Sequence, residues 1–545
     1  MHLIDRAAGI SARHPRLCSL VAGAVAACGF APLSLWPLTL AGIACLIELT
    51  ARAPSARRAF LIGWFFGFGL FTVGDNWIAT AFTYQAEMPA WLGWIAVLLL
   101  SLYLSVFPGL ATFGAWWFAQ TLRKPDGQGS AGMLPVGLAL APLWIITEWV
   151  RAWLFTGFAW NPLGVALLGG FASQGLALVA PWTGTYGLSG LLVLIGAALR
   201  SWARMVRLQR GIARLAWVAA GSALIASLTL LMVTPSSYLT PETSSIRYTL
   251  VQPDIRQEVL DNPRFYEAHF QKLAGLTRPQ RPGERRVVFW PESGMADYLR
   301  DGLPPYLYQQ MTYAADPVAA RKRLGRVIGP YGLLMTGAVD IVVEDGKAAG
   351  ARNTVTMFDG DGDILASYAK AHLVPYGEYL ALRWLLEPLG ASRLVAGTLD
   401  FWSGPGPRTF DFGQFGEAGV QICYEIIFSG QVVDPANRPD YIFNPSNDGW
   451  FGPWGPPQHL AQARLRAIEE GLPVLRSTTT GISAVIDADG IVRAHVPRHR
   501  AGRLDGLIPA AKEATLFAHY GNALPLSWAA LLLIVSAVAL RRGRS

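Results

Sequence analysis

The chain has 545 residues, of which 52% are hydrophobic and only 15% are charged, with a mean hydropathy of +0.32. Soluble domains carry about 25% charged residues, so these totals exclude an entirely soluble protein and indicate that a large part of the chain lies in lipid. The net charge of +8 would suit a nucleic-acid partner, but the positions of the basic residues favour another explanation.

Eight apolar runs are long enough to cross a bilayer as helices, which takes about 20 residues each. The fourth run contains Pro108 and is long, so we expect it to tilt or kink. Asp75 and Asn76 mark the end of the third run. The runs cover residues 17–33, 35–51, 59–80, 90–120, 134–154, 183–200, 213–234 and 525–540.

The loops between these runs alternate in their content of Lys and Arg. Basic residues cluster before the first run, at 52–58, at 123–124, through 200–214 and after the last run, whereas the loops near 80–90 and 155–182 contain none. The positive-inside rule therefore predicts cytoplasmic termini, with residues 235–524 on the other side of the membrane. The basic charge is then partly a topology signal, and no nucleic-acid partner is expected.

Residues 235–524 are richer in Pro, Gly and charged residues, and their apolar runs have the length of strands. A helix is predicted at 458–473, where apolar residues recur at helical spacing before a Gly-Leu-Pro stop. Strands that alternate with helical patterns predict an exported α/β domain, large enough for one core. The strands are predicted at 248–254, 286–293 and 333–343, twice within 353–370, at 419–425 and 440–448, and as a hairpin within 481–496.

One of the four cysteines differs from the others in its position in the chain. Cys18, Cys28 and Cys45 lie in or beside the first two apolar runs, so Cys423 is the only cysteine of the exported segment. An exported compartment is normally oxidising, and a thiol without a partner there risks oxidation and mispairing. Inert packing is the ordinary role of a free cysteine, so both a structural and a catalytic role stay open on this observation alone.

Three polar side chains stand where apolar strands give way to turns: Glu292 after VVFWP, Lys370 after ILASYA and Cys423 after GVQI. Taken singly, they fit a solvated carboxylate, a surface lysine and a packed thiol. Taken together they supply a base for the thiol, a cation for an oxyanion and a nucleophile. No zinc-type CxxC pair, P-loop or dinucleotide motif follows a plausible strand, so no metal or cofactor is expected.

The ordered motifs WPES, KAHLVPYGEY, CYE, NDGWFG and QHLAQARLRAIEEGLPVLRSTTTGISAVID resemble those of bacterial apolipoprotein N-acyltransferases. In the membrane half, GFAPLSLWPL and EWVRAWLFTGFAWNPLG are similar to the same family, so the resemblance covers nearly the whole chain. It implies a membrane domain of eight helices with an exported nitrilase-like α-β-β-α sandwich. The implied boundaries are 1–234 for seven helices, 235–515 for the catalytic domain and 516–545 for the eighth helix and tail.

The resemblance also assigns roles to residues. It implies a catalytic triad of Glu292, Lys370 and Cys423, supported by a group consisting of Glu378, Tyr424 and Glu425. One departure concerns the stretch VQPDIRQEVLDNPRF, which lacks the tryptophan that family members often carry after this first strand. How the mouth of the pocket meets substrate is therefore not implied by the resemblance.

The implied reaction is the transfer of an acyl chain from the sn-1 position of a membrane glycerophospholipid to the α-amino group of a diacylglyceryl-cysteine. It runs through a thioester on Cys423, which predicts ping-pong kinetics. The implied partners are the phospholipid donor, the apolipoprotein acceptor and the bilayer, for a monomer without a cofactor. The implied location is the bacterial inner membrane, with the catalytic domain in the periplasm.

Two aromatic and apolar segments, 380–395 and 448–457, are candidates for lids that admit acyl chains, with ordinary core packing as the alternative. Glu148 and Arg151 stand at i and i+3, where they can pair on one face of a membrane helix. Charges inside a membrane are functional candidates, although a structural clamp is the favoured interpretation here. The lid candidates are Trp384, Trp450, Phe451 and Trp454.

Two other functions are compatible with parts of this pattern. A membrane-tethered amidase of the nitrilase type would use the same three catalytic residue types on small C–N substrates, but it would not need eight spans or aromatic lids. A transporter of lipids or lipoproteins without enzymatic activity would make use of intramembrane charges such as Glu148. It predicts that Cys423→Ala leaves function intact.

Overall fold

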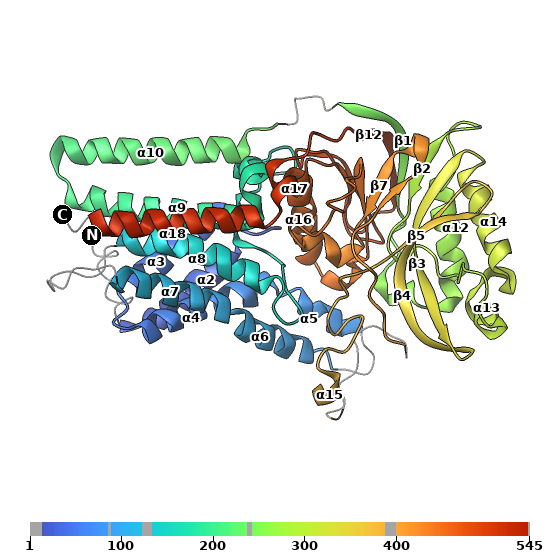
Figure 1. Cartoon of the computed structure of the whole chain (residues 1–545), viewed down its shortest axis with the longest axis horizontal. Helices are drawn as coiled ribbons and strands as arrows, with labels where there is room; N and C mark the ends of the chain where they lie inside the picture. Colours follow the sequence, from blue (N-terminus) through green and yellow to red (C-terminus); the bar gives the residue numbers. More distant parts are fainter. Residues whose placement is uncertain are drawn as a thin grey trace. The chain divides into compact units, whose positions relative to one another are not determined.

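The computed structural model describes residues 13–84, 89–121, 133–236, 242–386, 388 and 399–542. The chain forms two compact units (Figure 1). The basic stretches before residue 13, at 123–124 and after residue 542 lie outside the described residues. The helical unit comprises Met1–Ala79, Trp91–Ser236 and Tyr520–Ser545, and the α/β unit comprises Thr80–Ala90 and Ser237–His519.

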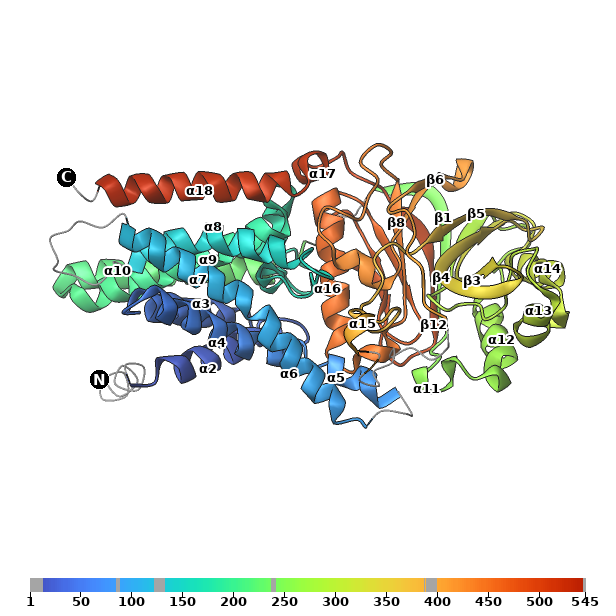
Figure 2. The same cartoon turned by 60° about the horizontal axis from the view of Figure 1, so that its bottom comes forward.

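Each of the eight predicted apolar runs contains helix, and the fourth run contains two helices that meet at Ser105, close to Pro108. By length and composition, four stretches of the described residues can cross a membrane: Ala56–Gly74, Leu92–Thr121, Leu176–Leu208 and Gly211–Val233. The long helices of the unit run side by side (Figure 2). They are α2 (Pro15–Ala27), α3 (Trp36–Ala51), α4 (Ala56–Gly74), α6 (Leu92–Leu104), α7 (Val106–Thr121), α8 (Met133–Arg151), α9 (Ala180–Leu208), α10 (Gly211–Val233) and α18 (Ala523–Arg542), with short turns at η2 (Leu163–Leu167) and η3 (Leu176–Val179).

Small residues allow these helices to approach closely. A Cβ on Gly23 of α2 would come within 1.9 Å of the Phe66 carbonyl oxygen on α4, so only glycine fits there. Close backbone approach of this kind is a usual source of stability between helices in lipid, where burial of apolar surface contributes little.

The α/β unit is built on two six-stranded sheets. In the first, the order is β12 (Gly502–Pro509), β1 (Thr243–Gln252), β2 (Arg286–Phe289), β3 (Gly332–Glu344), β4 (Lys347–Phe358) and β5 (Ile364–Ala369). In the second, it is β11 (Val492–Val496), β10 (Ser483–Ile486), β9 (Val474–Thr478), β8 (Tyr441–Ser446), β7 (Glu417–Val420) and β6 (Thr409–Asp411). The centre of each sheet is parallel and its edges are antiparallel.

The inner faces of the two sheets pack on each other through aromatic side chains. The ring of Phe289 on β2 lies 4.8 Å from that of Phe443 and 5.9 Å from that of Tyr441, both on β8. Helices α12 (Tyr266–Thr277) and α14 (Pro317–Ile328) contact the first sheet, and α16 (Gly455–Glu470) contacts the second. The layers therefore run helix, sheet, sheet, helix, which confirms the predicted α/β class.

Local patterns explain the covering helices. In α14, Ala320, Leu324 and Ile328 recur every four residues and are buried against the first sheet. Helix α16 ends at Gly471, whose φ of +65° suits a glycine C-cap. The shorter elements are α5 (Ile78–Ala81), η1 (Phe82–Tyr84), α11 (Gln257–Leu260), η4 (Pro263–Phe265), α13 (Pro305–Met311), η5 (Tyr313–Ala315), α15 (Arg383–Leu386), η7 (Gly413–Phe415), η8 (Cys423–Ile427), η9 (Asp448–Phe451) and α17 (Leu516–Tyr520).

Two of the predicted strands end four or five residues earlier than expected. The strand predicted at 286–293 stops at Phe289, and the one predicted at 419–425 stops at Val420. In both cases the chain leaves the sheet before the polar residue of interest. Glu292 and Cys423 therefore lie on turns rather than on strands, and Cys423 opens the short helix η8.

Candidate active site

Cys423 occupies a tight turn directly after β7. Its φ is +50°, in the left-handed region that side chains other than glycine rarely adopt. The side chain is 5% exposed. A strained, buried turn of this kind persists only where the surrounding structure holds it, and such turns concentrate at functional sites.

Glu425 fastens this turn to the neighbouring segment. Its Oε2 accepts a hydrogen bond from the Ile422 backbone N–H at 2.7 Å, while its Oε1 accepts from the Tyr368 hydroxyl at 2.9 Å and the Ala371 N–H at 2.7 Å. Burial raises the pKa of Glu425 to about 7, although these donors and Lys370 all favour the ionised form. Glu425 thus links the turn that carries Cys423 to the residues after Lys370.

Glu292 lies on the turn after β2, where its backbone passes close to β3. A Cβ on Gly337 would come within 2.7 Å of the Glu292 Cα, so this approach requires glycine. The two carboxylate oxygens are held separately: Oε1 accepts from the Asn353 side-chain amide and Oε2 from the Asn447 backbone N–H, each at 2.7 Å. The carboxylate therefore has a fixed position.

Lys370 follows β5 immediately and is 1% exposed. Its Nζ lies 2.9 Å from Glu378 Oε2 and 3.6 Å from Glu292 Oε1, and Asn353 bridges the same two carboxylates. Burial alone would lower the pKa of Lys370, but Glu378 and Glu292 hold it above its usual value. Lys370 is thus a permanently charged cation shared between two carboxylates.

The Cys423 thiol lies within the electrostatic field of this cluster. Burial raises the pKa of Cys423 well above its usual value, the Glu292 charge raises it further, and Lys370 opposes the rise. The Asn447 N–H, which donates to Glu292, also faces the thiol. The structure therefore brings Glu292, Lys370 and Cys423 together, with the thiol protonated at rest.

A second buried cluster, which the sequence did not predict, supports the Cys423 turn. His459 Nε2 lies 2.9 Å from the Cys423 carbonyl oxygen, and its Nδ1 lies 3.0 Å from both Asp448 Oδ1 and Arg476 Nη2. Burial and Arg476 lower the pKa of His459, so the ring is neutral. A neutral ring that accepts from Arg476 at Nδ1 donates from Nε2 to the Cys423 carbonyl, which holds the turn in place.

The predicted lid residues occupy different positions. Phe451 is buried, with its ring 5.7 Å from that of His459, and Trp450 meets the ring of Tyr84 edge to face at 5.8 Å. Trp454 is half-buried just before α16. Trp384 on α15 is 77% exposed, and much of the segment 380–395 lies outside the described residues. Tyr424 is buried, with its ring 5.2 Å from that of Phe428.

Glu148 and Arg151 belong to the helical unit, at the end of α8. Glu148 Oε1 accepts from the Leu163 backbone N–H at 2.8 Å, and Arg151 donates to the Trp160 carbonyl at 3.0 Å. Arg151 Nη2 and Glu148 Oε1 are 3.9 Å apart. Through these contacts the pair fastens the loop after α8 to the helix.

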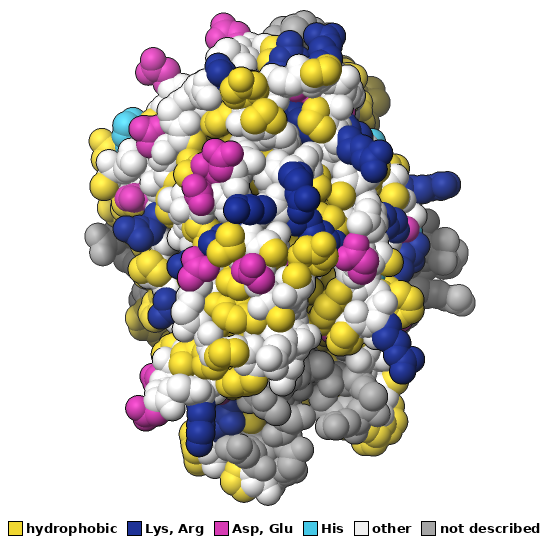
Figure 3. All heavy atoms as spheres, turned by 90° about the vertical axis from the view of Figure 1, so that its right-hand side faces the viewer, with side chains coloured by type: hydrophobic (Ala, Val, Ile, Leu, Met, Phe, Trp, Pro, Cys, Tyr) yellow, Lys and Arg dark blue, Asp and Glu magenta, His cyan; other side chains and the backbone are white. Residues whose placement is uncertain are grey.

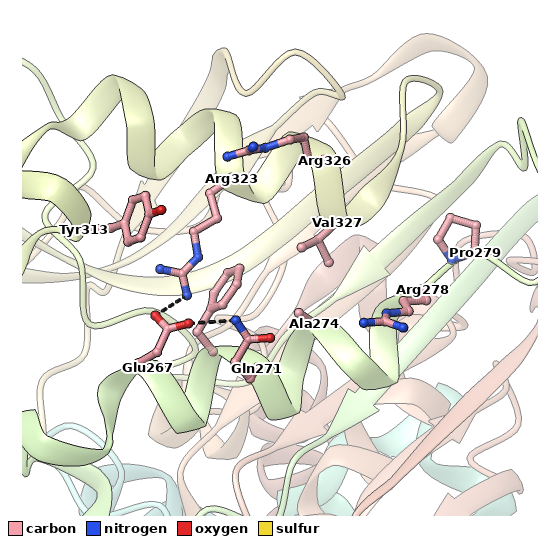
Figure 4. Close-up of a pocket in the computed structure, with 10 residues that line it drawn as sticks. Glu267, Gln271, Ala274, Arg278, Pro279, Tyr313, Arg323, Arg326 and Val327 are labelled. Atoms are coloured by element: carbon pink, nitrogen blue, oxygen red, sulfur yellow. Dashed lines mark hydrogen bonds and ion pairs between the residues drawn. The ribbon is translucent and has the colours of Figure 1, made fainter.

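The cavity in Figure 4 lies elsewhere, between α12 and α14, and has a volume of about 500 Å³. Arg323 pairs there with Glu267 at 2.7 Å and lies over the ring of Phe270, with its Cζ 3.3 Å from the ring centroid. None of the predicted site residues lines it. Within the described part of the chain, no three His, Cys, Asp or Glu side chains are placed to hold a metal ion.

Comparison with known proteins gives two family matches. Residues 22–198 match the model of the apolipoprotein N-acyltransferase N-terminal domain, and residues 252–512 match that of the carbon-nitrogen hydrolases. Among curated proteins, the chain is 32% identical to an apolipoprotein N-acyltransferase of Rhodopseudomonas palustris, over 96% of this chain and 95% of the relative. It is 34% identical to one of Bradyrhizobium diazoefficiens, over 96% and 94%.

Among solved structures, the chain is similar to an amidase of the nitrilase superfamily from Nesterenkonia AN1. The two share 17% sequence identity, with a TM-score of 0.33, over 53% of this chain and 95% of that one. A CN-hydrolase superfamily protein from Xanthomonas campestris is 18% identical, with a TM-score of 0.33, over 50% and 93%.

Proposed function

The chain belongs to the apolipoprotein N-acyltransferase family, and from this premise we propose that it acylates the N-terminus of lipoproteins. The proposed donor is the sn-1 ester of a membrane glycerophospholipid, and the acceptor is the α-amino group of an apolipoprotein's diacylglyceryl-cysteine. The observation that carries the proposal is the buried contact of Lys370 with Glu292 and Glu378, in whose field the Cys423 thiol lies. This cluster offers a base, a cation and a nucleophile.

In the first half-reaction, Glu292 takes the proton of the Cys423 thiol while the sulfur attacks the sn-1 carbonyl carbon. Because the thiol is protonated at rest, proton removal and attack occur together. Lys370 and backbone N–H groups near Tyr424 stabilise the charge that develops on the carbonyl oxygen. The C–O bond breaks, Glu292 gives the proton to the departing lysophospholipid oxygen, and the acyl chain stays on Cys423 as a thioester.

In the second half-reaction, the lipoprotein amine attacks the thioester carbonyl carbon while Glu292 accepts a proton from the nitrogen. The C–S bond breaks, and the sulfur of Cys423 regains that proton. One site serves both substrates in turn, which predicts ping-pong kinetics. The aromatic residues proposed as lids exclude water, which would otherwise compete with the amine for the thioester. They are Trp384, Trp450, Phe451 and Trp454.

The helical unit is proposed to lie in the bacterial inner membrane with eight spanning helices. Residues 1–234 would supply seven of them and residues 516–545 the eighth, while residues 235–515 act in the periplasm. The alternating basic loops support cytoplasmic termini. Glu148 and Arg151 serve as a clamp in this unit. The reaction requires only the phospholipid, the apolipoprotein and the bilayer, so a monomer suffices and no nucleic acid takes part.

Reconstitution of the full chain tests the proposal. The protein would be incubated with a phospholipid labelled in its sn-1 chain and with a synthetic diacylglyceryl-cysteine peptide. We expect the label on the peptide amine, none from a phospholipid labelled only at sn-2, and none with Cys423→Ala. Hydrolysis of small amides without any transfer to the peptide would contradict the proposal and favour the amidase.

A further inference from the structure

Arg498 is a half-buried arginine in the connection between β11 and β12. Within the described residues, no Asp or Glu oxygen lies within ion-pair distance of its guanidinium. Asp448 does act on Arg498 electrostatically, but both of its oxygens are already bound by Arg476, at 2.8 Å each. A half-buried guanidinium that forms no ion pair with a carboxylate can still bind an anionic ligand.

Hydrogen bonds connect the surroundings of Arg498 to the candidate active site. The Asn447 backbone N–H holds Glu292, and its side-chain oxygen accepts from the Thr479 hydroxyl at 2.7 Å. The next residue, Thr480, lies 3.1 Å from His499 Nδ1 through its hydroxyl, and its carbonyl accepts from the His499 backbone N–H at 3.0 Å. Asp448 also acts on both Cys423 and Arg498. Arg498 therefore lies at the border of the site.

A second arginine, Arg256, and the aromatic pair of Tyr84 and Trp450 lie near Arg498. Partial burial and the Arg256 charge lower the pKa of Arg498, and Tyr84, which also lies near it, meets the ring of Trp450 edge to face at 5.8 Å. Arg256 is held by Asp254 at 2.9 Å, and that carboxylate also accepts from Thr480. The other acid near Tyr84, Glu258, is exposed to solvent.

We propose that Arg498, with Arg256 beside it, binds the phosphodiester of the phospholipid donor and thereby positions the sn-1 ester at Cys423. This inference rests on the proposed function and names the residues that select its donor. A guanidinium matches the geometry of phosphate oxygens and binds them in pairs. Only the short glycerol linker separates the phosphate from the sn-1 carbonyl, so both groups have to bind close together. The rings of Tyr84 and Trp450 suit that amphipathic linker.

The three arginines that line the cavity in Figure 4 do not combine these features. In Figure 4, Arg323 is neutralised by Glu267, whereas Arg278 and Arg326 are exposed. Figure 3 shows the face of the molecule on which α12, α13 and α14 lie, with Lys and Arg side chains interspersed with Asp and Glu side chains. Charges of this kind are hydrated and contribute little. Arg326 is therefore a matched control, because it is an exposed arginine without any contact to the Cys423 network.

The test measures thioester formation on Cys423 by intact-protein mass spectrometry, with two donors that share the same acyl chains. One donor is phosphatidylethanolamine and the other is diacylglycerol, which lacks the phosphate. With phosphatidylethanolamine, Arg498→Gln is expected to raise the half-saturating donor concentration by roughly 10-fold or more, the usual effect of losing one charge-assisted hydrogen bond. With diacylglycerol, the variant and the wild type should behave alike. Arg498→Lys should recover part of the loss, and Arg326→Gln should change nothing.

Three results would overturn the inference. Arg498→Gln with unchanged use of phosphatidylethanolamine would exclude a phosphate contact, and equal losses with both donors would indicate a purely structural role. If soluble glycerol 3-phosphate inhibited the wild type and Arg498→Gln equally, phosphate recognition would lie elsewhere. If the wild type forms no thioester with either donor, the proposed function itself is contradicted. The measurement on the wild type therefore separates a failure of the proposed function from a failure of this inference.

Discussion

In the α/β unit, the buried carboxylates of Glu292, Glu378 and Glu425 accept hydrogen bonds at both oxygens. In the helical unit, Asp75 buries two carboxylate oxygens that find no hydrogen-bond partner among the described residues. Exposure does not distinguish them, since Asp75 is 2% exposed and Glu425 is 1% exposed. The difference lies in the hydrogen bonds that each carboxylate accepts.

This comparison separates two uses of buried charge. Carboxylates held at both oxygens have fixed positions, which lets them act on a substrate without reorganisation. A buried carboxylate without partners lowers stability and has no fixed direction. Glu148 lies between these cases, because its Oε1 accepts hydrogen bonds from Trp144 and Leu163 while its Oε2 finds no partner among the described residues. Substitutions in the two units should therefore have effects of very different size.

Lys370→Met breaks the network at its centre and should give the largest effect. Glu292 and Glu378 would remain buried without their cation, which typically lowers the free energy of unfolding by about 3–5 kcal/mol. Acyl transfer should fall by at least about 100-fold, because an oxyanion donor is lost as well. Calorimetry and peptide acylation measure the two effects. Lys322→Met on the exposed side of α14 is the control, and a Lys370→Met protein with near-normal transfer would refute this assignment.

Glu292→Gln should slow acyl transfer by about 10²–10⁴-fold, the usual contribution of a general base. Alkylation of Cys423 by iodoacetamide should respond in the opposite direction. The thiolate is the reactive form, and the Glu292 charge raises the pKa of Cys423, so its removal lowers that pKa. The pH profile of alkylation should thus move to lower pH in the variant. A profile that stays in place or moves to higher pH would contradict the proximity of the two groups.

His459→Gln should have an intermediate effect through the backbone. The loss of the bond to the Cys423 carbonyl leaves the turn less well held, so we expect kcat to fall about 10- to 100-fold with little change in the KM for the donor. Steady-state kinetics separate the two constants. An equal rise in KM, or no change in kcat, would show that His459 does not position the nucleophile.

Asp75→Asn should have the smallest effect. Since neither oxygen of Asp75 has a hydrogen-bond partner to lose among the described residues, the neutral amide should leave the free energy of unfolding unchanged or raise it, and acyl transfer should stay the same. Thermal unfolding in detergent and peptide acylation are the measurements. A loss of transfer with an intact fold would show that the helical unit contains a second functional group.

Short-range patterns in the sequence predicted much of the secondary structure. All eight apolar runs contain helix, and the hairpin within 481–496 forms as β10 and β11. Strands β9 and β12 were missed because polar residues interrupt them: Arg476 lies in the middle of VLRST, and Arg503 and Asp505 lie in GRLDGLIP. The amphipathic helices α12 and α14 were missed because the apolar stripe of each is short and surrounded by charge.

At the site, the residue types at the ends of strands predicted Glu292, Lys370 and Cys423, and the structure brings them together. The conformation of Cys423 could not be predicted, because its turn is contacted by residues distant in the sequence, such as His459, which lies 36 residues further along the chain. Asn353 and Asn447 were missed for the same reason, since nothing local marks their contacts with Glu292. Arg476 did leave a signal, because a charge inside a buried strand requires a partner.

The most direct test of the central claim is intact-protein mass spectrometry of the full chain after incubation with phospholipid alone, beside Cys423→Ala. We expect a mass increase of one acyl chain, which hydroxylamine removes and which the variant lacks. Intact wild-type protein that gains no mass from ample phospholipid would contradict a thioester on Cys423 and, with it, the proposed acyl transfer.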